Sequence, residues 1–350
     1  MPDPETSTPR FDSLAYTLAR YREVKPRLAC DPTARDDAEI NAWMLMARAK
    51  LRELIGPMPE ERVDLNPAYG EPTRKDGYRR RALSFATRPD LSAFGYLLIP
   101  DGAKAGTPAV LCVPGHGRGV DEIVGIDDEG KDRDHIDGYQ HDFAVQCVRQ
   151  GYVTLAIEPL GFGRRRDPAA RASGAGRTSC QPAAGAALML GETMIGWRTW
   201  DAMRALDLLA SRPEVDPKRM AMMGISGGGT VTMYTAALDD RVKAAVLSGS
   251  FCTFKDSIFS LSHCIDNYVP DILTWFEAAD LAGLIAPRGL FVENGKADRI
   301  FPQGGVDAAF AVAKGIYQGR GVPDQIDHAS FDGGHQFDGT AAFRRLKGWL

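Results

Sequence analysis

One serine in this sequence is flanked by glycines, in a G-x-S-x-G motif at residues 224–228. The mostly apolar run at residues 219–223 predicts a buried strand, and residues 229–238 predict a helix. In a sharp turn between a strand and a helix, Ser226 would have a strained backbone and a hydroxyl held clear of the sheet. The glycines two residues to either side would let the two elements approach without Cβ clashes. The motif therefore predicts a nucleophilic serine at the end of a central strand.

A nucleophilic serine needs a base, and the base needs a carboxylate that orients it. For this strand–turn–helix arrangement the expected chain order is Ser, then Asp or Glu, then His. Only His263, His328 and His335 follow Ser226. His335 is the predicted base because it lies in a glycine-rich turn, whereas His328 lies inside a strand-like run and His263 precedes the acid.

The predicted acid is Asp298, in the loop that follows a buried strand at residues 290–292. Loops at the carboxyl ends of strands are where ligands and catalytic groups gather in open α/β sheets. Glu293, at the end of the same strand, stays open as the alternative acid. We expect Asp298 because its loop has the reach to meet His335.

An oxyanion hole should complete the site. One donor is expected to be the backbone N–H of Gly227, directly after the nucleophile. The second is expected from the loop after the strand at residues 108–113, supplied by Arg118 or Gly117. His116, in the same loop, is expected to brace it and to border the substrate pocket.

The chain resembles the α/β-hydrolase superfamily, and within it the branch of dienelactone hydrolases and acetyl xylan esterases. The stretches that carry the resemblance are residues 113–117, 150–163, 223–229 and 332–335, and together they extend over roughly residues 75–350. The resemblance implies a mainly parallel, twisted sheet covered by helices on both faces. It also implies a serine esterase that acts on small acyl groups, often acetyl groups on sugars, without a cofactor or metal.

The resemblance leaves alternatives. Dienelactone hydrolases use a cysteine nucleophile, so Ser226 argues against that activity. Residues 213–219 also look like the catalytic domains of prolyl oligopeptidases, which keeps a peptidase or amidase open. A non-catalytic binding protein on the same fold is a further alternative.

Hydrophobic periodicity predicts two regions. Residues 1–75 form a helical N-terminal extension, in which apolar residues of the segment 40–54 share one helical face. This extension would pack against the core, cover the site or join a second subunit in a homo-oligomer. Strands and helices alternate through residues 76–350, which predicts an α/β-hydrolase catalytic domain. Residues 164–196 and 250–280 are expected insertions near the site, and Phe251 and Tyr268 from the second are expected in the substrate pocket.

Charge and composition narrow the partners and the location. A net charge of −4 gives no general attraction to nucleic acid or to an anionic membrane. No apolar run reaches the length of a membrane span, and the N-terminus does not resemble a signal peptide. The six cysteines are scattered without a C-x-x-C motif, which favours free thiols in the cytoplasm over disulfides or zinc. The acidic stretch at residues 121–142 is expected to be a solvated loop rather than a metal site.

Overall fold

A single nine-stranded sheet organises the protein. The structure is a computed structural model that describes residues 11–31, 33 and 36–350. The strand order is β1-β2-β3-β5-β4-β6-β7-β8-β9. The strands are β1 (Ala68–Lys75), β2 (Tyr78–Arg88), β3 (Leu91–Pro100), β4 (Thr107–Val113), β5 (Val153–Ile157), β6 (Val215–Ile225), β7 (Val242–Ser248), β8 (Gly289–Gly295) and β9 (Ile326–Phe331).

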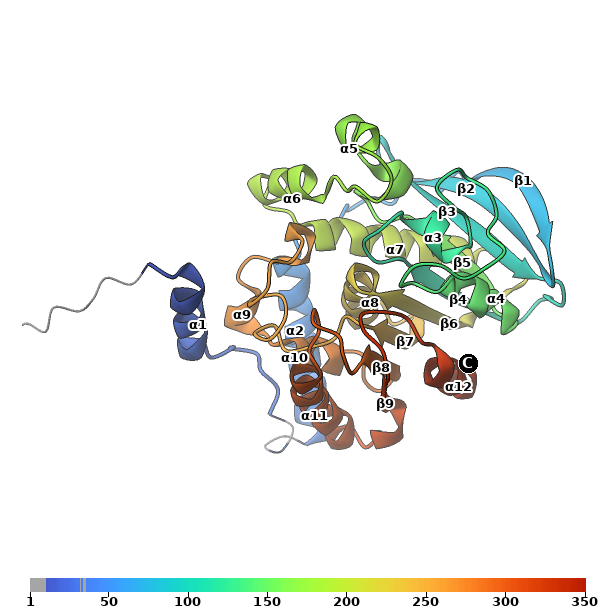
Figure 1. Ribbon diagram of the computed structural model, residues 1–350. Coiled ribbons are helices and arrows are strands. Elements are labelled where there is room, and N and C mark those ends of the chain that lie inside the picture. The colour runs from blue at the N-terminus through green and yellow to red at the C-terminus, as the bar shows by residue number, and fades with distance from the viewer. Residues whose placement is uncertain (1–10, 32, 34–35) are drawn as a thin grey trace, which may run out of the picture.

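The sheet is antiparallel at one side and parallel through the rest. β1, β2, β3 and β5 pair successively in antiparallel fashion, whereas β5, β4, β6, β7, β8 and β9 run parallel. Figure 1 shows β1, β2 and β3 fanning away from the parallel strands at one side of the molecule. The predicted α/β-hydrolase architecture is confirmed.

Helices cover both faces of this sheet. They are α1 (Ser13–Glu23), α2 (Asp37–Leu54), α3 (Val120–Ile123), α4 (Phe143–Arg149), α5 (Pro168–Ala172), α6 (Cys180–Met189), α7 (Met194–Ala210), α8 (Gly227–Leu238), α9 (Ile272–Trp275), α10 (Ala278–Gly283), α11 (Gln303–Gly319) and α12 (Thr340–Trp349). One hydrophobic core lies between the sheet and α2, α7, α8, α10 and α11, and the other lies under α3, α4 and α12. None of the helices in the described part of the chain is long and apolar enough to cross a membrane.

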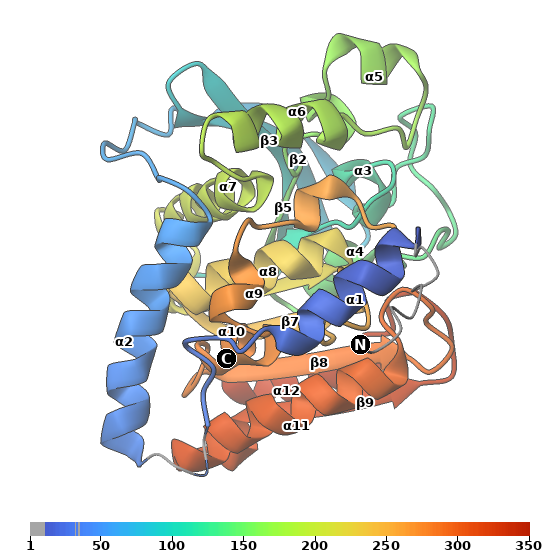
Figure 2. The same cartoon turned by 90° about the vertical axis from the view of Figure 1, so that its left-hand side faces the viewer.

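The helix α2 forms where the sequence predicts it. Asp36 caps its first turn, and Glu39 returns a hydrogen bond to the Asp36 backbone, so the first turn begins with a capping box. Trp43 is fully buried on the predicted face and donates from Nε1 to the Leu28 carbonyl oxygen at 2.7 Å. Figure 2 shows α2 running along one edge of the molecule, where it packs against α8 and α11.

The predicted boundary at residue 75 differs from the structure. The strand β1 lies within residues 1–75, yet it pairs with β2 and belongs to the sheet. Most of its side chains are exposed, and it lies at the edge of the sheet with β2 as its one neighbouring strand. The helical part of the N-terminal region therefore ends before Ala68, and its first ten residues lie outside the described residues.

Candidate active site

Ser226 occupies the turn between β6 and α8. Its backbone has φ 54° and ψ −127°, which a non-glycine residue rarely adopts and which the flanking elements must hold. A Cβ on Gly224 would lie 2.3 Å from the Gly228 carbonyl oxygen, and one on Gly228 would lie 2.0 Å from the Val113 carbonyl oxygen. Both glycines of the motif are therefore required by close backbone approach, as the sequence predicts.

Asp298 and His335 meet at the ends of β8 and β9. His335 Nδ1 lies 2.7 Å from Asp298 Oδ2. The other carboxylate oxygen, Oδ1, accepts hydrogen bonds from the backbone N–H groups of Ile300 at 2.8 Å and Phe301 at 3.1 Å. Asp298 is almost fully buried, so its contact with His335 is shielded from water. This geometry fixes which carboxylate oxygen faces the imidazole.

Glu293, the alternative acid, has other partners. Its carboxylate accepts from the backbone N–H groups of Asp338 at 3.2 Å and Gly339 at 3.0 Å. Burial raises the pKa of Glu293 to about 7, although these donors oppose the shift. The structure therefore pairs His335 with Asp298, and Glu293 anchors the chain that follows His335.

Two aromatic rings hold the His335 imidazole between them. Tyr139 stacks on it with ring centroids 5.3 Å apart, and Phe301 stacks at 5.8 Å. The space beside the ring is also closed by Gly249, where a Cβ would lie 3.3 Å from His335 Nδ1. Stacking on both neighbours fixes the plane of the imidazole.

Ser226 and His335 line one cavity of about 340 Å³. The other lining residues are His116, Tyr139, Gly227, Leu261, Ser262, His263, Cys264, Asn267, Ile300 and Phe301. The structure thus brings the three predicted triad residues together, in the chain order that the motif requires.

The expected oxyanion donors differ in their surroundings. Gly227 lines the cavity, and the His116 ring lies against it. The Arg118 backbone N–H instead donates to Glu122 Oε2 at 3.2 Å, so this expectation is wrong. A Cβ on Gly117 would lie 2.6 Å from the same carboxylate oxygen, and Gly117 as a donor stays a prediction.

The two aromatic residues expected in the pocket lie elsewhere. Phe251 is 1% exposed and belongs to the hydrophobic core. Tyr268 lies in a separate apolar groove with Phe254, Ile258 and Phe259. Neither lines the cavity of Ser226, because the insertion at 250–280 presents its residues around 261–267 to that cavity instead.

Tyr139 and His263 line the cavity, although the sequence does not single out Tyr139 and rejects His263 as the base. Tyr139 donates its hydroxyl to the His116 carbonyl oxygen at 2.7 Å, and this hydroxyl also reaches the Ser226 side chain. His263 contacts the Ser257 hydroxyl at 2.9 Å, and burial, together with the charge of His116, lowers its pKa to about 4. No sequence motif marks Tyr139, which lies within the acidic stretch.

A buried group of charged and thiol side chains adjoins the cavity. His116 Nε2 lies 3.0 Å from Asp266 Oδ2, and Arg198 pairs with the same carboxylate. Burial by itself favours the neutral imidazole, but the contacts with Asp266 and Cys180 outweigh it and raise the pKa of His116 to about 9. His116 and Asp266 therefore form a second histidine–aspartate pair, and His116 lines the same cavity as Ser226.

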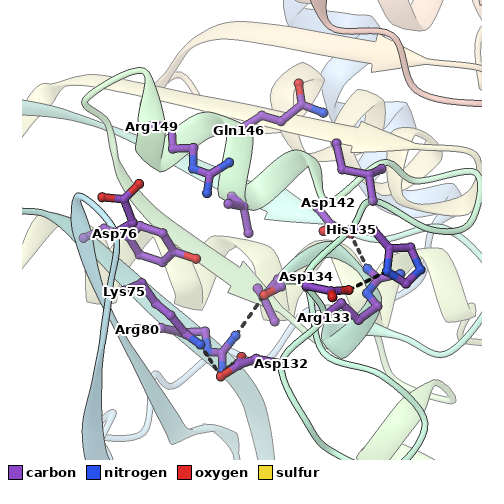
Figure 3. Close-up of a pocket in the computed structure, with 15 residues that line it drawn as sticks. Lys75, Asp76, Arg80, Asp132, Arg133, Asp134, His135, Asp142, Gln146 and Arg149 are labelled. Atoms are coloured by element: carbon purple, nitrogen blue, oxygen red, sulfur yellow. Dashed lines mark hydrogen bonds and ion pairs between the residues drawn. The ribbon is translucent and has the colours of Figure 1, made fainter.

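A different cavity lies between the antiparallel strands and the acidic stretch (Figure 3). Its charged residues pair with one another: Asp132 contacts both Lys75 and Arg80, and Arg133 contacts Asp142. The acidic stretch is thus tied to β1 and β2 by ion pairs instead of being a fully solvated loop. No triad residue lines this cavity.

Known proteins resemble this chain in sequence and in fold. A family model described as "Abhydrolase family" matches residues 7–332. The chain belongs to this family. A Bacillus subtilis (strain 168) protein, "Putative hydrolase YtaP", is 30% identical over 321 residues, which cover 87% of this chain and 98% of that protein. The resemblance to α/β-hydrolases drawn from the sequence is therefore confirmed.

Solved structures with this fold include several esterases. A Bacteroides fragilis structure described as a "putative acetyl xylan esterase" superposes with a TM-score of 0.77 at 20% identity, covering 94% of this chain and 84% of that one. A Solibacter usitatus glucuronoyl esterase gives a TM-score of 0.65 at 16% identity, covering 93% and 98%. At these identities the likeness concerns the fold.

Proposed function

We propose that the protein is a serine esterase that hydrolyses carboxylic esters with small acyl groups. The observation that carries this proposal is the His335–Asp298 contact at 2.7 Å, on the wall of the cavity that Ser226 also lines. Membership of a hydrolase family and the strained Ser226 backbone support the same function.

The reaction runs through an acyl-enzyme. As Ser226 Oγ attacks the ester carbonyl, His335 Nε2 takes the hydroxyl proton, while Nδ1–H stays bonded to Asp298 Oδ2. The Gly227 N–H stabilises the oxyanion, and one such donor contributes ~3 kcal/mol in comparable sites. His335 then protonates the leaving alcohol. A water molecule that gives its proton to His335 finally releases the carboxylic acid and restores Ser226.

The cavity of Ser226 has a partly apolar wall, which suits a small acyl group. Leu261, Ile300 and Phe301 supply apolar surface, and the three lining histidines supply polar groups. Acetyl xylan and glucuronoyl esterases share the fold, which supports acetyl esters of sugars as the first natural substrates to test. None of the residues that line this cavity favours a peptide or amide substrate over an ester.

Hydrolysis of p-nitrophenyl esters from acetate to decanoate tests the proposal. Wild-type activity should be highest on the short esters, from acetate up to butyrate, and should fall steeply beyond butyrate. Ser226→Ala should abolish turnover, whereas Ser92→Ala, at an exposed site on β3, should keep it. A fluorophosphonate probe should label the wild type and leave Ser226→Ala unlabelled. Retained hydrolysis in Ser226→Ala would end this proposal, and faster cleavage of matched amides would replace the esterase with an amidase.

A cytoplasmic location and a homo-oligomer complete the proposal. Cys112, Cys147 and Cys252 are buried thiols, which suits a reducing compartment. The predicted apolar face of α2 is already buried within its own chain, so a second subunit would contact exposed apolar residues of the extension, such as Phe11, Leu45 and Met46.

A further inference from the structure

Four side chains of the types that bind metal ions converge beside the candidate active site. They are His116 from the β4–α3 loop, Cys180 at the start of α6, and Cys264 and Asp266 from the segment after β7. Their ligand atoms all lie within 4.8 Å of one another, and Cys180 and Asp266 are almost completely buried. The proposed ester hydrolysis uses neither the two thiols nor the Asp266 carboxylate.

We propose that these four side chains bind one divalent transition-metal ion, with Zn²⁺ as the best match. One imidazole nitrogen, two thiolates and one carboxylate oxygen are the donors that zinc takes in four-coordinate tetrahedral sites. A hard ion such as Mg²⁺ or Ca²⁺ would instead require a set made of oxygen donors.

Two of the donor spacings lie close to those of a tetrahedral site. Metal–ligand distances of about 2.0 to 2.3 Å place neighbouring ligand atoms roughly 3.3–3.8 Å apart. Here Asp266 Oδ2 lies 3.0 Å from His116 Nε2 and 3.2 Å from Cys180 Sγ. An ion would therefore need to open these two contacts by a few tenths of an ångström. It would draw together those of the remaining donor atoms that lie farther apart, all of which are within 4.8 Å of one another.

Outer partners orient the donors and balance their charge. Arg198 Nη2 donates to Cys180 Sγ at 3.2 Å, and its Nη1 pairs with Asp266, while Asn267 Nδ2 donates to Asp266 Oδ1 at 3.0 Å. Such outer hydrogen bonds fix metal ligands in place. Two thiolates and one carboxylate carry three negative charges, which one divalent ion and the Arg198 guanidinium neutralise together. Without the ion, protons must supply that balance in a buried site.

The ion would connect three segments that enclose the cavity of Ser226. His116 packs against Gly227, Cys180 begins the helix of the first insertion, and Cys264 lines the cavity itself. Its role is to hold these segments in register, since the proposed hydrolysis needs no metal-bound step. This inference therefore stands apart from the proposed esterase function.

Metal content of the full-length protein tests the proposal. Protein expressed with added zinc and passed through a desalting column should carry about one zinc per chain by plasma mass spectrometry. Cys180→Ser and Cys264→Ser should each lose it. Cys252→Ala, which removes a buried thiol outside the cluster, and Ser226→Ala should both keep it.

A second measurement does not depend on the folding of the variants. Wild-type protein stripped with a chelator and titrated with Co²⁺ should show the intense near-ultraviolet band of thiolate-to-cobalt charge transfer, saturating at one equivalent. Readdition of Zn²⁺ should remove this band and raise Tm. Absence of both bound zinc and the cobalt band, or a Cys180–Cys264 disulfide detected by intact mass, would overturn the metal site.

Discussion

Asp298→Asn offers the sharpest test of the triad. Asp298 Oδ1 accepts from two backbone N–H groups, and Oδ2 faces His335 Nδ1. In the variant, the amide must keep its oxygen toward the two N–H donors, because turning its NH₂ to them would leave both unsatisfied, at ~1–3 kcal/mol each. The NH₂ then faces His335 Nδ1 and can only donate to it.

This amide orientation forces the wrong tautomer on His335. With Nδ1 as an acceptor, the proton lies on Nε2, which can no longer take the Ser226 proton. The same substitution in a serine protease triad lowers kcat by about 10⁴-fold, equivalent to about 5 kcal/mol of transition-state stabilisation. We expect a loss of that size in kcat with p-nitrophenyl acetate, with little change in KM, since the carboxylate lies behind the imidazole.

Glu293→Gln is the matched control, because Glu293 is the other buried acid of the same strand end. Burial raises its pKa to about 7, and each of its carboxylate oxygens accepts from a backbone N–H group. The amide leaves one of these two donors unsatisfied, at a cost in stability of ~1–3 kcal/mol, but leaves the contact between His335 and Asp298 in place. We expect kcat within tenfold of wild type. Full activity in Asp298→Asn, or a collapse of activity in a folded Glu293→Gln, would refute this assignment of the acid.

Two further predictions concern Tyr139, which lines the cavity of Ser226, and Glu158, which is fully buried after β5. Tyr139→Phe keeps the stack on His335 but loses the hydroxyl that donates to the His116 carbonyl oxygen. For a bond worth ~1 kcal/mol, kcat/KM should fall about fivefold, and an unchanged value would show that this hydroxyl does not support the site. Burial raises the pKa of Glu158 to about 7, although the backbone N–H groups of Val120 and Arg164 donate to its carboxylate and oppose the shift. Its contribution to the free energy of unfolding is therefore complete below the pKa of the unfolded chain and is lost as the pH rises through 7. In urea unfolding, the free energy of unfolding of Glu158→Gln should therefore rise relative to that of wild type as the pH is raised from 5 to 8. If the two proteins show the same pH dependence of stability, the raised pKa of Glu158 is wrong.

The sequence predicts most of the fold because its central strands are buried on both faces. Runs such as 108–113 and 290–292 are continuously apolar, and both are strands of the parallel part of the sheet. The edge strand β1 could not be predicted in this way. Its side chains are mostly exposed, so no alternation marks it, and its pairing with β2 defines it instead.

The same difference separates the site residues that the sequence predicts from those that it does not. Ser226, Asp298 and His335 follow strand ends, so the sheet determines where they meet, and strand order alone brings them together. Arg118 lies in a loop whose path depends on the Glu122 carboxylate, which no local pattern reveals. The cluster around Asp266 draws on three separated segments, and scattered cysteines in a sequence carry no sign that two of them will be neighbours.

The position of α2 links the N-terminal region to the nucleophile. This helix shares a hydrophobic core with α8, the helix that begins at Gly227 directly after Ser226. The family match begins at residue 7, so the region that relatives have in common includes α2. Removing α2 would expose the apolar side of α8 to water and loosen the support beneath the strained serine turn. Protein engineers should therefore treat this helix as part of the catalytic unit, and place fusion partners or affinity tags ahead of α1.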